Sequence, residues 1–537
     1  MIVAMRRPIT GGAMAALLPH FGPTQSLEPP LSPEMHQADQ APFLSPDLPP
    51  AEFQALGHRV IDLIAEYYTS MSREAVDRGT APPAFPAVRP ADVAAMFTGH
   101  APEHPEPVDA ILADWSNTIL PNASHLGHPR WFGFVNGTGT QISVLAEALA
   151  AALDPNLGGF RASPSATEVE RQTIRWCAEL IGYNPDCGGL FLSGGTMANV
   201  TAIRVALQAK AKWDIGRDGL QSPDRPGRMT VYMADHETHV SFVRAVELLG
   251  LGLAALRKVP SNPDFTIDTA ALERMLDDDI ANGMTPFCIV GHVGSINVGA
   301  IDDLDALADV ARRRDLWFHA DGACGALGAM LPEMSRAFHG LARADSVSFD
   351  AHKWLGVPYE AGCLLVREPE TMRAAFALTA SYLLPSATSE YSGLNYFDYG
   401  PQLSRSWRAL KVWMSLRHYG AEGYRTFFRQ TIACAKHLHT LVLASDDFEV
   451  VQPEPALYLY SFRWAPPSLR GDDARLDELN QRITDELQSR RLAFAMTTRI
   501  HGRVTQRLSI CSHRTTIADI DATFNAMREI GQELLKG

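Results

Sequence analysis

The feature that most constrains the fold is an alternation, from about residue 141 onward, of short apolar runs with longer amphipathic stretches. Most of the runs are apolar throughout rather than at every second position, which is typical of strands covered by helices on both faces. We expect strands at 189–192, 229–233, 287–290, 316–319, 346–349 and 362–366. The stretches between them, such as 168–181 and 304–314, have helical spacing. The pattern predicts an α/β domain with a mostly parallel sheet.

Residues outside this region predict further parts. Residues 1–50 are rich in Pro, Ser and Gln and predict a flexible arm. Residues 51–140 form a predicted N-terminal helical segment, with apolar residues at helical spacing from Phe53 to Tyr67. That apolar stripe must pack against the rest of the chain or against a partner subunit. Residues 141–410 are the predicted large domain, and 411–537 a smaller C-terminal α/β domain with a strand at 507–511 and a helix at 517–535.

Charge and cysteine content exclude several classes of protein. The net charge of −14 argues against a nucleic acid or an anionic membrane as partner, since both attract an excess of Lys and Arg. No apolar run is long enough to span a bilayer, so we expect no membrane association. The seven cysteines are scattered and form no C-x-x-C motif. This pattern predicts free thiols in a reducing compartment, and we expect a soluble, cytoplasmic protein.

Small residues follow the first predicted strand. The segment SGGTMAN (193–199) leads from that strand into an apolar helix and includes Gly194, Gly195 and Thr196. Small residues let the backbone approach a ligand, and a helix N-terminus offers free N–H groups to a phosphate. A tight turn capped by Thr196 explains the same pattern equally well.

Histidine and aspartate follow two other predicted strands. His236 and His239 come after 229–233 but lack the H-E-x-x-H pattern, so we predict no metal site. An imidazole there can stack on an aromatic cofactor or pack in the core. Asp321 follows the strand at 316–319 and can cap a turn or hold a buried cation, such as a protonated ring nitrogen.

A lysine stands in an apolar setting after the strand at 346–349. Lys353 is flanked by His352, Trp354 and Leu355, although lysine is normally a surface residue. Either it points outward from a loop or it is kept in a pocket for its chemistry. A phosphate loop, a histidine, a strand-end aspartate and a lysine together fit one ligand, pyridoxal phosphate, which has a phosphate, an aromatic ring, a basic ring nitrogen and an aldehyde.

From about residue 51 onward the chain resembles the group II pyridoxal-phosphate-dependent amino acid decarboxylases, which include aromatic-L-amino-acid, histidine and glutamate decarboxylases. The matching segments, in family order, are HPRWFGF (128–134), SPSATEVE (163–170), SGGTMAN (193–199), THVSFVRA (238–245), GSINVGAIDDL (294–304), HADGACG (319–325), DAHKWL (350–355) and LSRSWRALKVW (403–413). The resemblance implies an aspartate-aminotransferase-type fold (fold type I). It also implies a homodimer with active sites at the subunit interface and with residues 51–140 packed on the partner.

The resemblance also implies roles for individual residues. Lys353 matches the lysine that forms the Schiff base, and burial is expected to lower its pKa and make it a better nucleophile. Asp321 matches the carboxylate that pairs with the pyridinium nitrogen, and His239 matches the imidazole stacked on the ring. The remaining predicted cofactor contacts are Gly194, Gly195, Thr196, His292, Ala323, Asp350 and His352.

The resemblance implies decarboxylation to an amine and CO2. Tyr382, in ASYLLP (380–385), matches the tyrosine of the family's mobile loop that supports return of a proton, and related plant enzymes with another residue there make aldehydes. An aldehyde synthase or an aminotransferase on the same scaffold remains open. A non-catalytic scaffold protein is disfavoured, because it would require neither Lys353 nor Asp321 nor His239.

Several positions depart from the animal aromatic-amino-acid enzymes. His292 stands where a Thr is usual, and Cys324 replaces a Tyr. Asp350 stands in place of an Asn near the phosphate, and because two anions repel we expect its carboxylate to point elsewhere. The loop from Phe134 to Thr138 replaces a bulkier aromatic segment.

These departures bear on the substrate. Phe134, and Phe160 from the partner subunit, would offer aromatic faces. Arg405 and Arg408 match family arginines that bind a carboxylate, fix the loop or form ordinary ion pairs. Arg161 could receive an acidic side chain or pair with a surface acid. We predict an aromatic amino acid as substrate, with an acidic amino acid as the alternative.

Overall fold

The computed structural model describes residues 47–222, 224–225, 227–235, 238–377 and 392–536. The chain forms two compact units, one up to Glu66 and one from Tyr67 onward. The predicted arm at 1–50 lies almost wholly outside the described residues. The predicted helix near Phe53 is confirmed as α1 (Pro50–Ser70), which begins at the second of two prolines.

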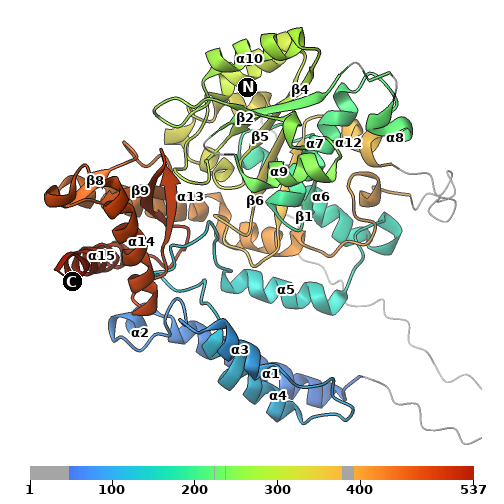
Figure 1. The fold of residues 1–537 in the computed structure, drawn as a ribbon. Helices are drawn as coiled ribbons and strands as arrows, with labels where there is room; N and C mark the ends of the chain where they lie inside the picture. The colour runs from blue at the N-terminus through green and yellow to red at the C-terminus, as the bar shows by residue number, and fades with distance from the viewer. Residues whose placement is uncertain (1–46, 223, 226, 236–237, 378–391, 537) are drawn as a thin grey trace, which may run out of the picture. The chain divides into compact units, whose positions relative to one another are not determined.

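A seven-stranded sheet forms the centre of the larger unit (Figure 1). Its strands are β1 (Gly188–Leu192), β2 (Met229–Ala234), β3 (Leu256–Val259), β4 (Thr285–His292), β5 (Trp317–Asp321), β6 (Ser346–Asp350) and β7 (Gly362–Val366). The order is β1-β7-β6-β5-β4-β2-β3, and β7 runs antiparallel to both of its neighbours while the other pairs are parallel. The mostly parallel sheet and all six expected strands are confirmed. The edge strand β3 was not predicted, because two of its four residues are Arg and Lys.

Helices cover both faces of this sheet. One face packs on α6 (Pro164–Leu180), α10 (Thr269–Ala281), α11 (Leu304–Arg314) and α13 (Ala409–Leu443). The other face packs on α7 (Gly195–Lys210), α9 (Val240–Leu248) and α12 (Pro369–Phe376). Within β1, Phe191 enters the first core while Leu190 and Leu192 enter the second. Two-sided burial therefore explains why the strands are apolar at consecutive positions.

An antiparallel sheet follows in the C-terminal part. It has the order β10-β11-β9-β8 and consists of β8 (Phe448–Val450), β9 (Leu459–Trp464), β10 (Met496–Ile500) and β11 (Arg503–Ser509). It packs on α14 (Asp473–Ser489), α15 (Ile517–Lys536) and the second half of α13. The helix predicted at 517–535 is confirmed as α15, and the strand predicted at 507–511 overlaps β11. The remaining α-helices of the described residues are α2 (Arg73–Asp77), α3 (Pro90–Met96), α4 (Val108–Asp114), α5 (Gln141–Leu153) and α8 (Ile215–Asp218).

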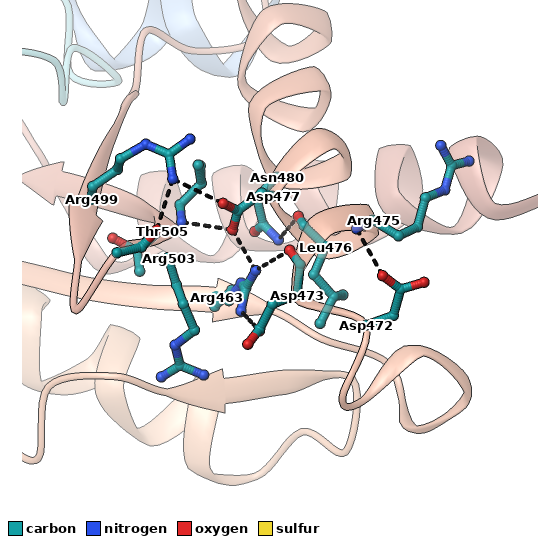
Figure 2. Close-up of polar contacts among 12 residues, drawn as sticks. Arg463, Asp472, Asp473, Arg475, Leu476, Asp477, Asn480, Arg499, Arg503 and Thr505 are labelled. Carbon is teal, nitrogen blue, oxygen red and sulfur yellow. Dashed lines mark hydrogen bonds and ion pairs between the residues drawn. The ribbon is translucent and has the colours of Figure 1, made fainter.

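A buried arginine joins the strands and helix of this C-terminal part (Figure 2). Arg463 in β9 is fully buried, and its guanidinium contacts one carboxylate oxygen each of Asp473 and Asp477 in α14, both at 2.6 Å. Asp477 also accepts the backbone N–H of Val504 in β11 at 2.8 Å and pairs with Arg499 of β10 at 3.0 Å. One carboxylate thus links α14 to three strands.

The segment at 128–134 joins this sheet from far away in the sequence. Phe494 donates its backbone N–H to Arg130 O at 3.0 Å, and Phe132 donates to Phe494 O at 2.7 Å. Ser509, at the end of β11, donates to Phe132 O at 3.0 Å. These bonds place Phe134 next to residues of the C-terminal part.

Candidate active site

The predicted cofactor residues lie together around two adjoining cavities at the carboxyl ends of the parallel strands. The larger has a volume of about 490 Å³ and is lined by Phe134, Gly194, Gly195, Thr196, His239, Ala323, Asp350, His352 and Lys353, among others. The smaller is lined by His239, His292, Asp321, Ala323, Cys324 and Lys353, with Gly294, Ser295 and Ile296. The structure thus brings together residues from several strands and helices, as expected for the carboxyl edge of an open α/β sheet.

Lys353 points into the cavities rather than into solvent. It lies in the turn after β6, and its backbone N–H donates to Asp350 O at 3.1 Å. Its Nζ is 3.2 Å from Asp350 Oδ2 and 3.6 Å from Cys324 Sγ. Burial lowers the pKa of Lys353, but the carboxylates of Asp350 and Asp321 raise it more, so the pKa lies above that of an ordinary lysine. The lowered pKa expected from burial alone is therefore wrong, because the adjacent carboxylates stabilise the ammonium.

A glycine supports the backbone of this lysine. Gly137 donates its N–H to His352 O at 3.2 Å, and a Cβ at Gly137 would lie 1.9 Å from Lys353 O. Only glycine leaves room for this approach of two backbone segments. The loop after Phe134 therefore fixes the position of the Lys353 backbone, and with it the point from which the side chain enters the cavity.

Asp321, the last residue of β5, is held by a polar network. Its Oδ1 accepts the N–H of Ala323 at 3.2 Å and the hydroxyl of Ser348 at 3.3 Å, and its Oδ2 accepts from Asn199 Nδ2 at 3.3 Å. Burial raises the pKa of Asp321, but His292 and the hydrogen bond from the N–H of Ala323 lower it more, so the net pKa lies below the ordinary value. The carboxylate is therefore ionised and suited to hold a cationic ring nitrogen.

His239 is oriented by the helix that it precedes. It is the N-cap of α9, and its Nδ1 accepts the backbone N–H of Ser241 at 3.2 Å. A ring nitrogen that accepts from a backbone N–H carries no proton, which leaves the proton on Nε2. Burial lowers the pKa of His239, so the imidazole is neutral at pH 7. A neutral, flat ring facing the cavity is suited to cover one face of an aromatic cofactor.

The N-terminus of α7 opens onto the larger cavity. Gly194 is its N-cap, with φ of +151°, and Ala198 N–H donates the first intrahelical bond, to Gly194 O. Helix geometry leaves the N–H groups of Gly195, Thr196 and Met197 for a ligand. The alternative in which Thr196 caps this helix is wrong, because the helix already begins at Gly195.

Asp350 does not point away from this helix end, contrary to expectation. A Cβ at Gly195 would lie 2.7 Å from Asp350 Oδ2, so the carboxylate lies against the first residue of α7. Asp350 is buried, and its Oδ1 has no hydrogen-bond partner among the described residues. The register of β6 with β7 sets this position, since Asp350 pairs with Gly362 and a Cβ there would lie 2.4 Å from Gly194 C.

Two residues that differ from those of the animal aromatic-amino-acid enzymes, His292 and Cys324, line the smaller cavity. His292, the last residue of β4, lies beside Asp321 in the strand register, and its buried Nε2 has no hydrogen-bond partner within the described part of the chain. Cys324 is buried, and burial raises the pKa of its thiol, so the thiol is neutral. His352 lines the larger cavity instead, where its Nδ1 accepts Ala361 N–H at 3.2 Å and its ring packs on Tyr359.

Further residues line the larger cavity without having been predicted. They include Ile296, Met496 and Arg507, and also Asn199, which donates to Asp321. Arg507 in β11 is buried and donates to Ile296 O at 3.1 Å. The sequence shows a charged residue at the start of the apolar strand predicted at 507–511. It does not show which cavity that strand borders, so it could not predict that Arg507 lines the larger one.

Comparison with known proteins agrees with this geometry. A family model described as the pyridoxal-dependent decarboxylase conserved domain matches residues 90–465. The chain belongs to this family. It is 30% identical over 483 residues to an aromatic-L-amino-acid decarboxylase of Bacillus atrophaeus, covering 90% of this chain and 96% of the relative. It is 28% identical over 495 residues to a phenylacetaldehyde synthase of Petunia hybrida, covering 90% and 94%.

A solved structure supports the fold assignment. The Oryza sativa TDC, solved with PLP and tryptamine, superposes with a TM-score of 0.83 at 26% identity, covering 91% of this chain and 99% of that one. The fold is therefore of the fold type I class, and the protein is a pyridoxal-phosphate-dependent amino acid decarboxylase, a carboxy-lyase. Among the residues described, no helix is both long and apolar enough to cross a membrane.

The residues of this decarboxylase fit pyridoxal phosphate. The Gly194–Thr196 turn offers a helix N-terminus at which a side chain on Gly195 would meet Asp350. Asp321 is buried and ionised, and no Lys or Arg pairs with it among the described residues. Lys353 lines both cavities. These groups would hold, respectively, the phosphate, the ring nitrogen and the aldehyde carbon.

Some predicted substrate residues do not line these cavities. Arg405 is buried elsewhere: it pairs with Glu170 at 2.5 Å, donates to Phe191 O at 2.9 Å and lies over the ring of Tyr396. Its partners therefore support an ion pair within the core rather than contact with a substrate. Phe160 packs against Gly393 and donates its N–H to Asn395.

Two other arginines that were considered from the sequence do not line either cavity. Arg408 pairs with Glu360 at 2.6 Å, which agrees with the ion-pair interpretation. Arg161 is exposed and does not line either cavity. Tyr382 and His236 lie outside the described residues, so their predicted roles have no structural counterpart here.

Proposed function

We propose that this decarboxylase converts an aromatic L-amino acid to its amine and CO2. The observation that carries the proposal is the wall of the larger cavity. Phe134 is 52% exposed at its mouth, and behind it Phe494 stacks on Trp131 with ring centroids 4.2 Å apart. Met496 lines the same wall, so an aromatic side chain would find apolar and aromatic partners there. The names of the similar proteins from Bacillus atrophaeus and Petunia hybrida support an aromatic substrate.

The chain's own groups would divide the work. When bound, pyridoxal phosphate supplies an aldehyde that bonds to amines and a ring that accepts the electrons of the broken bond. Lys353 would supply the amine that retains the cofactor, and Asp321 would keep a proton on the ring nitrogen. His239 would cover one ring face, and the N–H groups at the start of α7 would bind the phosphate.

Arg507 would pair with a carboxylate of the substrate. It lies in the wall of the larger cavity, and a guanidinium binds a carboxylate through two parallel hydrogen bonds. Fixing that group would orient the bond to be broken, and such positioning selects one reaction among those open to the same cofactor. An acidic amino acid as substrate is the alternative, in which Arg507 would receive the side-chain carboxylate instead.

The outcome of the reaction depends on the return of a proton. Tyr382 matches the loop tyrosine associated with decarboxylation, which favours an amine over an aldehyde as the product. We expect Tyr382→Phe to lower amine formation and to raise aldehyde and peroxide relative to CO2. Unchanged products in this variant would remove Tyr382 from the proposal.

The proposal includes a homodimer in the cytoplasm. Residues 51–140 would pack on the partner subunit, and Phe160 would reach the partner's active site. The seven cysteines are all free, and six are buried, which supports a reducing compartment. Analytical ultracentrifugation of the full chain tests the dimer, and a monomer with full activity would refute the shared site.

The decisive experiment is product analysis with each common amino acid. The cofactor-loaded protein is incubated with one amino acid at a time, and CO2, amine, aldehyde, ammonia and peroxide are measured together. CO2 and amine in equal amounts from Phe, Tyr or Trp would support the proposal. Turnover of Glu or Asp alone would favour the acidic alternative, and aldehyde with peroxide would identify an aldehyde synthase.

A further inference from the structure

We propose that Asp350 and the phosphate of the bound cofactor share one proton, which the protein takes up from water when the cofactor binds. The inference rests on the proposed placement of the phosphate at the start of α7. It concerns the residue that stands where the animal aromatic-amino-acid enzymes have Asn.

The carboxylate of Asp350 lies against the start of α7. Asp350 is the last residue of β6, is 3% exposed, and lies so close to α7 that a Cβ on Gly195 would be 2.7 Å from its Oδ2. A phosphate bound by the N–H groups of Gly195 and Thr196 would therefore be a direct neighbour of this carboxylate. Two anions at such close range repel each other strongly where little water screens them.

One oxygen of this carboxylate has no hydrogen-bond partner among the described residues. Oδ1 of Asp350 is buried and accepts no hydrogen bond from any described residue. A buried acceptor without a partner costs about 1–3 kcal/mol, and more when it is charged. A proton held between Oδ1 and a phosphate oxygen would satisfy this atom and remove one negative charge at the same time.

The charges of the surrounding groups also bear on this carboxylate. Among the described residues, the basic groups within ion-pair distance of Asp350 are Lys353 at 3.2 Å and His352 at 3.7 Å. Burial lowers the pKa of His352, so its ring is neutral at pH 7. Lys353 would bond to the aldehyde of the cofactor and would no longer be an ion-pair partner of Asp350 alone.

Arg507 is a cation in the wall of the same cavity, but it would be engaged by the carboxylate of the substrate. The remaining titratable groups near Asp350 are neutral or anionic. The nearest element on one side is β7, where Cys363 is a buried, neutral thiol. On the other sides lie Asp321 from β5, which is an anion, His239 from α9, which is neutral, and Cys324, a neutral thiol. Tyr359 and Tyr458, whose pKa values burial raises, are neutral as well.

The proton balance is simple. A free phosphate monoester with a second pKa near about 6 is mostly dianionic at pH 7, and a free aspartate is ionised. Binding would add one proton from water to this pair of anions, and no covalent bond forms or breaks in this step. Cofactor affinity would then fall with rising pH by about tenfold per pH unit, through linkage with that proton.

Phosphorus NMR of the loaded enzyme tests the proposal without relying on activity. The ³¹P shift of the bound cofactor distinguishes a protonated phosphate from a dianion as pH is varied. In the unmodified protein we expect the protonated form to persist at least two pH units above the transition of the free cofactor, near about pH 6. A dianionic phosphate at pH 7 in the unmodified protein would overturn the inference.

Matched variants locate the effect. Asp350→Asn keeps the size of the side chain but removes its charge, and we expect its bound phosphate to be dianionic at pH 7 and its cofactor affinity to lose the tenfold dependence per pH unit. Asp345→Asn makes the same charge change just before the other end of β6, where Asp345 accepts the N–H of Phe318. We expect it to behave like the unmodified protein, and identical ³¹P titrations for Asp350→Asn and the unmodified protein would refute a role for Asp350.

A further variant separates this inference from the phosphate placement on which it rests. Gly195→Ala would put a methyl group against Asp350 and should weaken cofactor binding at every pH. If Gly195→Ala folds, as judged by circular dichroism, and binds the cofactor normally, the phosphate does not lie at α7 and both proposals fail. If it weakens binding while Asp350→Asn leaves the ³¹P titration unchanged, only the shared proton is refuted.

Discussion

Replacing Gly137 by alanine should displace the lysine that holds the cofactor. The Cβ that Gly137→Ala introduces would lie 1.9 Å from Lys353 O, whereas real Cβ contacts are essentially never under 3.0 Å. The two backbone segments must therefore separate by at least about 1.1 Å (3.0 minus 1.9). The atom met is a backbone carbonyl, so no side-chain rotation can relieve the contact.

The displacement has a predictable cost. Misplacement of a reacting group by about 1 Å can reduce the rate by about 100-fold. Because Lys353 follows β6 directly, its Nζ would move relative to Asp321, which lies on β5 and is not displaced. We therefore expect kcat of Gly137→Ala to fall by about 100-fold.

The assay compares variants at equal cofactor content. Bound pyridoxal phosphate is released with alkali and quantified, and CO2 release is then measured at saturating substrate. Gly99→Ala is the matched control, since a Cβ at Gly99 meets nothing within 4 Å. If Gly137→Ala retains kcat within about twofold of the unmodified protein, the reasoning from this close approach is refuted.

Three further predictions follow from the fold, the substrate site and the buried histidines. Arg463→Met should lower the free energy of unfolding by about 2 kcal/mol, because it removes the charged hydrogen bonds of a buried guanidinium to two partly exposed carboxylates. The exposed pair of Arg475 should contribute less than about 1 kcal/mol, and equal urea midpoints for Arg463→Met and Arg475→Met would contradict this. Arg507→Gln should reduce kcat/KM roughly 10- to 100-fold by removing a charged hydrogen bond, with no change in inhibition by the product amine, which has no carboxylate; equal losses for both would refute the assigned contact. Burial lowers the pKa of His319 to about 4, so between about pH 6.5 and pH 4 the unfolded chain binds a proton that the folded chain does not. The free energy of unfolding should therefore decrease as the pH is lowered through that window, by up to about 1.4 kcal/mol per pH unit, and a urea midpoint that is the same at pH 7 and pH 5 would contradict this.

Local sequence was enough to predict six of the seven strands of the central sheet and the polar residues that gather at its carboxyl edge. Each strand core is a short run of consecutive apolar residues, and two-sided burial leaves such a run few other conformations. The residues that follow the strands, such as Gly195, Asp321 and Lys353, needed no knowledge of distant contacts, because parallel strands all end at one edge of the sheet. Motif and placement therefore agree for these residues.

Contacts between distant segments decided what the sequence left open. Arg405 and Arg507 are both arginines in apolar surroundings, yet Arg405 pairs with Glu170 in the core and Arg507 borders the larger cavity. Their local sequences do not distinguish these outcomes, since the partner of each lies more than two hundred residues away.

The electrostatics of the site likewise depend on the tertiary structure. Burial alone predicts a lowered pKa for Lys353, but the approach of Asp350 and Asp321 reverses its direction. Nor does the local sequence around Gly137 indicate that it lies under the backbone of Lys353. The sequence by itself thus determined which chemical groups meet at the edge of the sheet. Only the tertiary structure decided their charges, their partners and the shape of the space between them, because these depend on distances between segments that are remote along the chain.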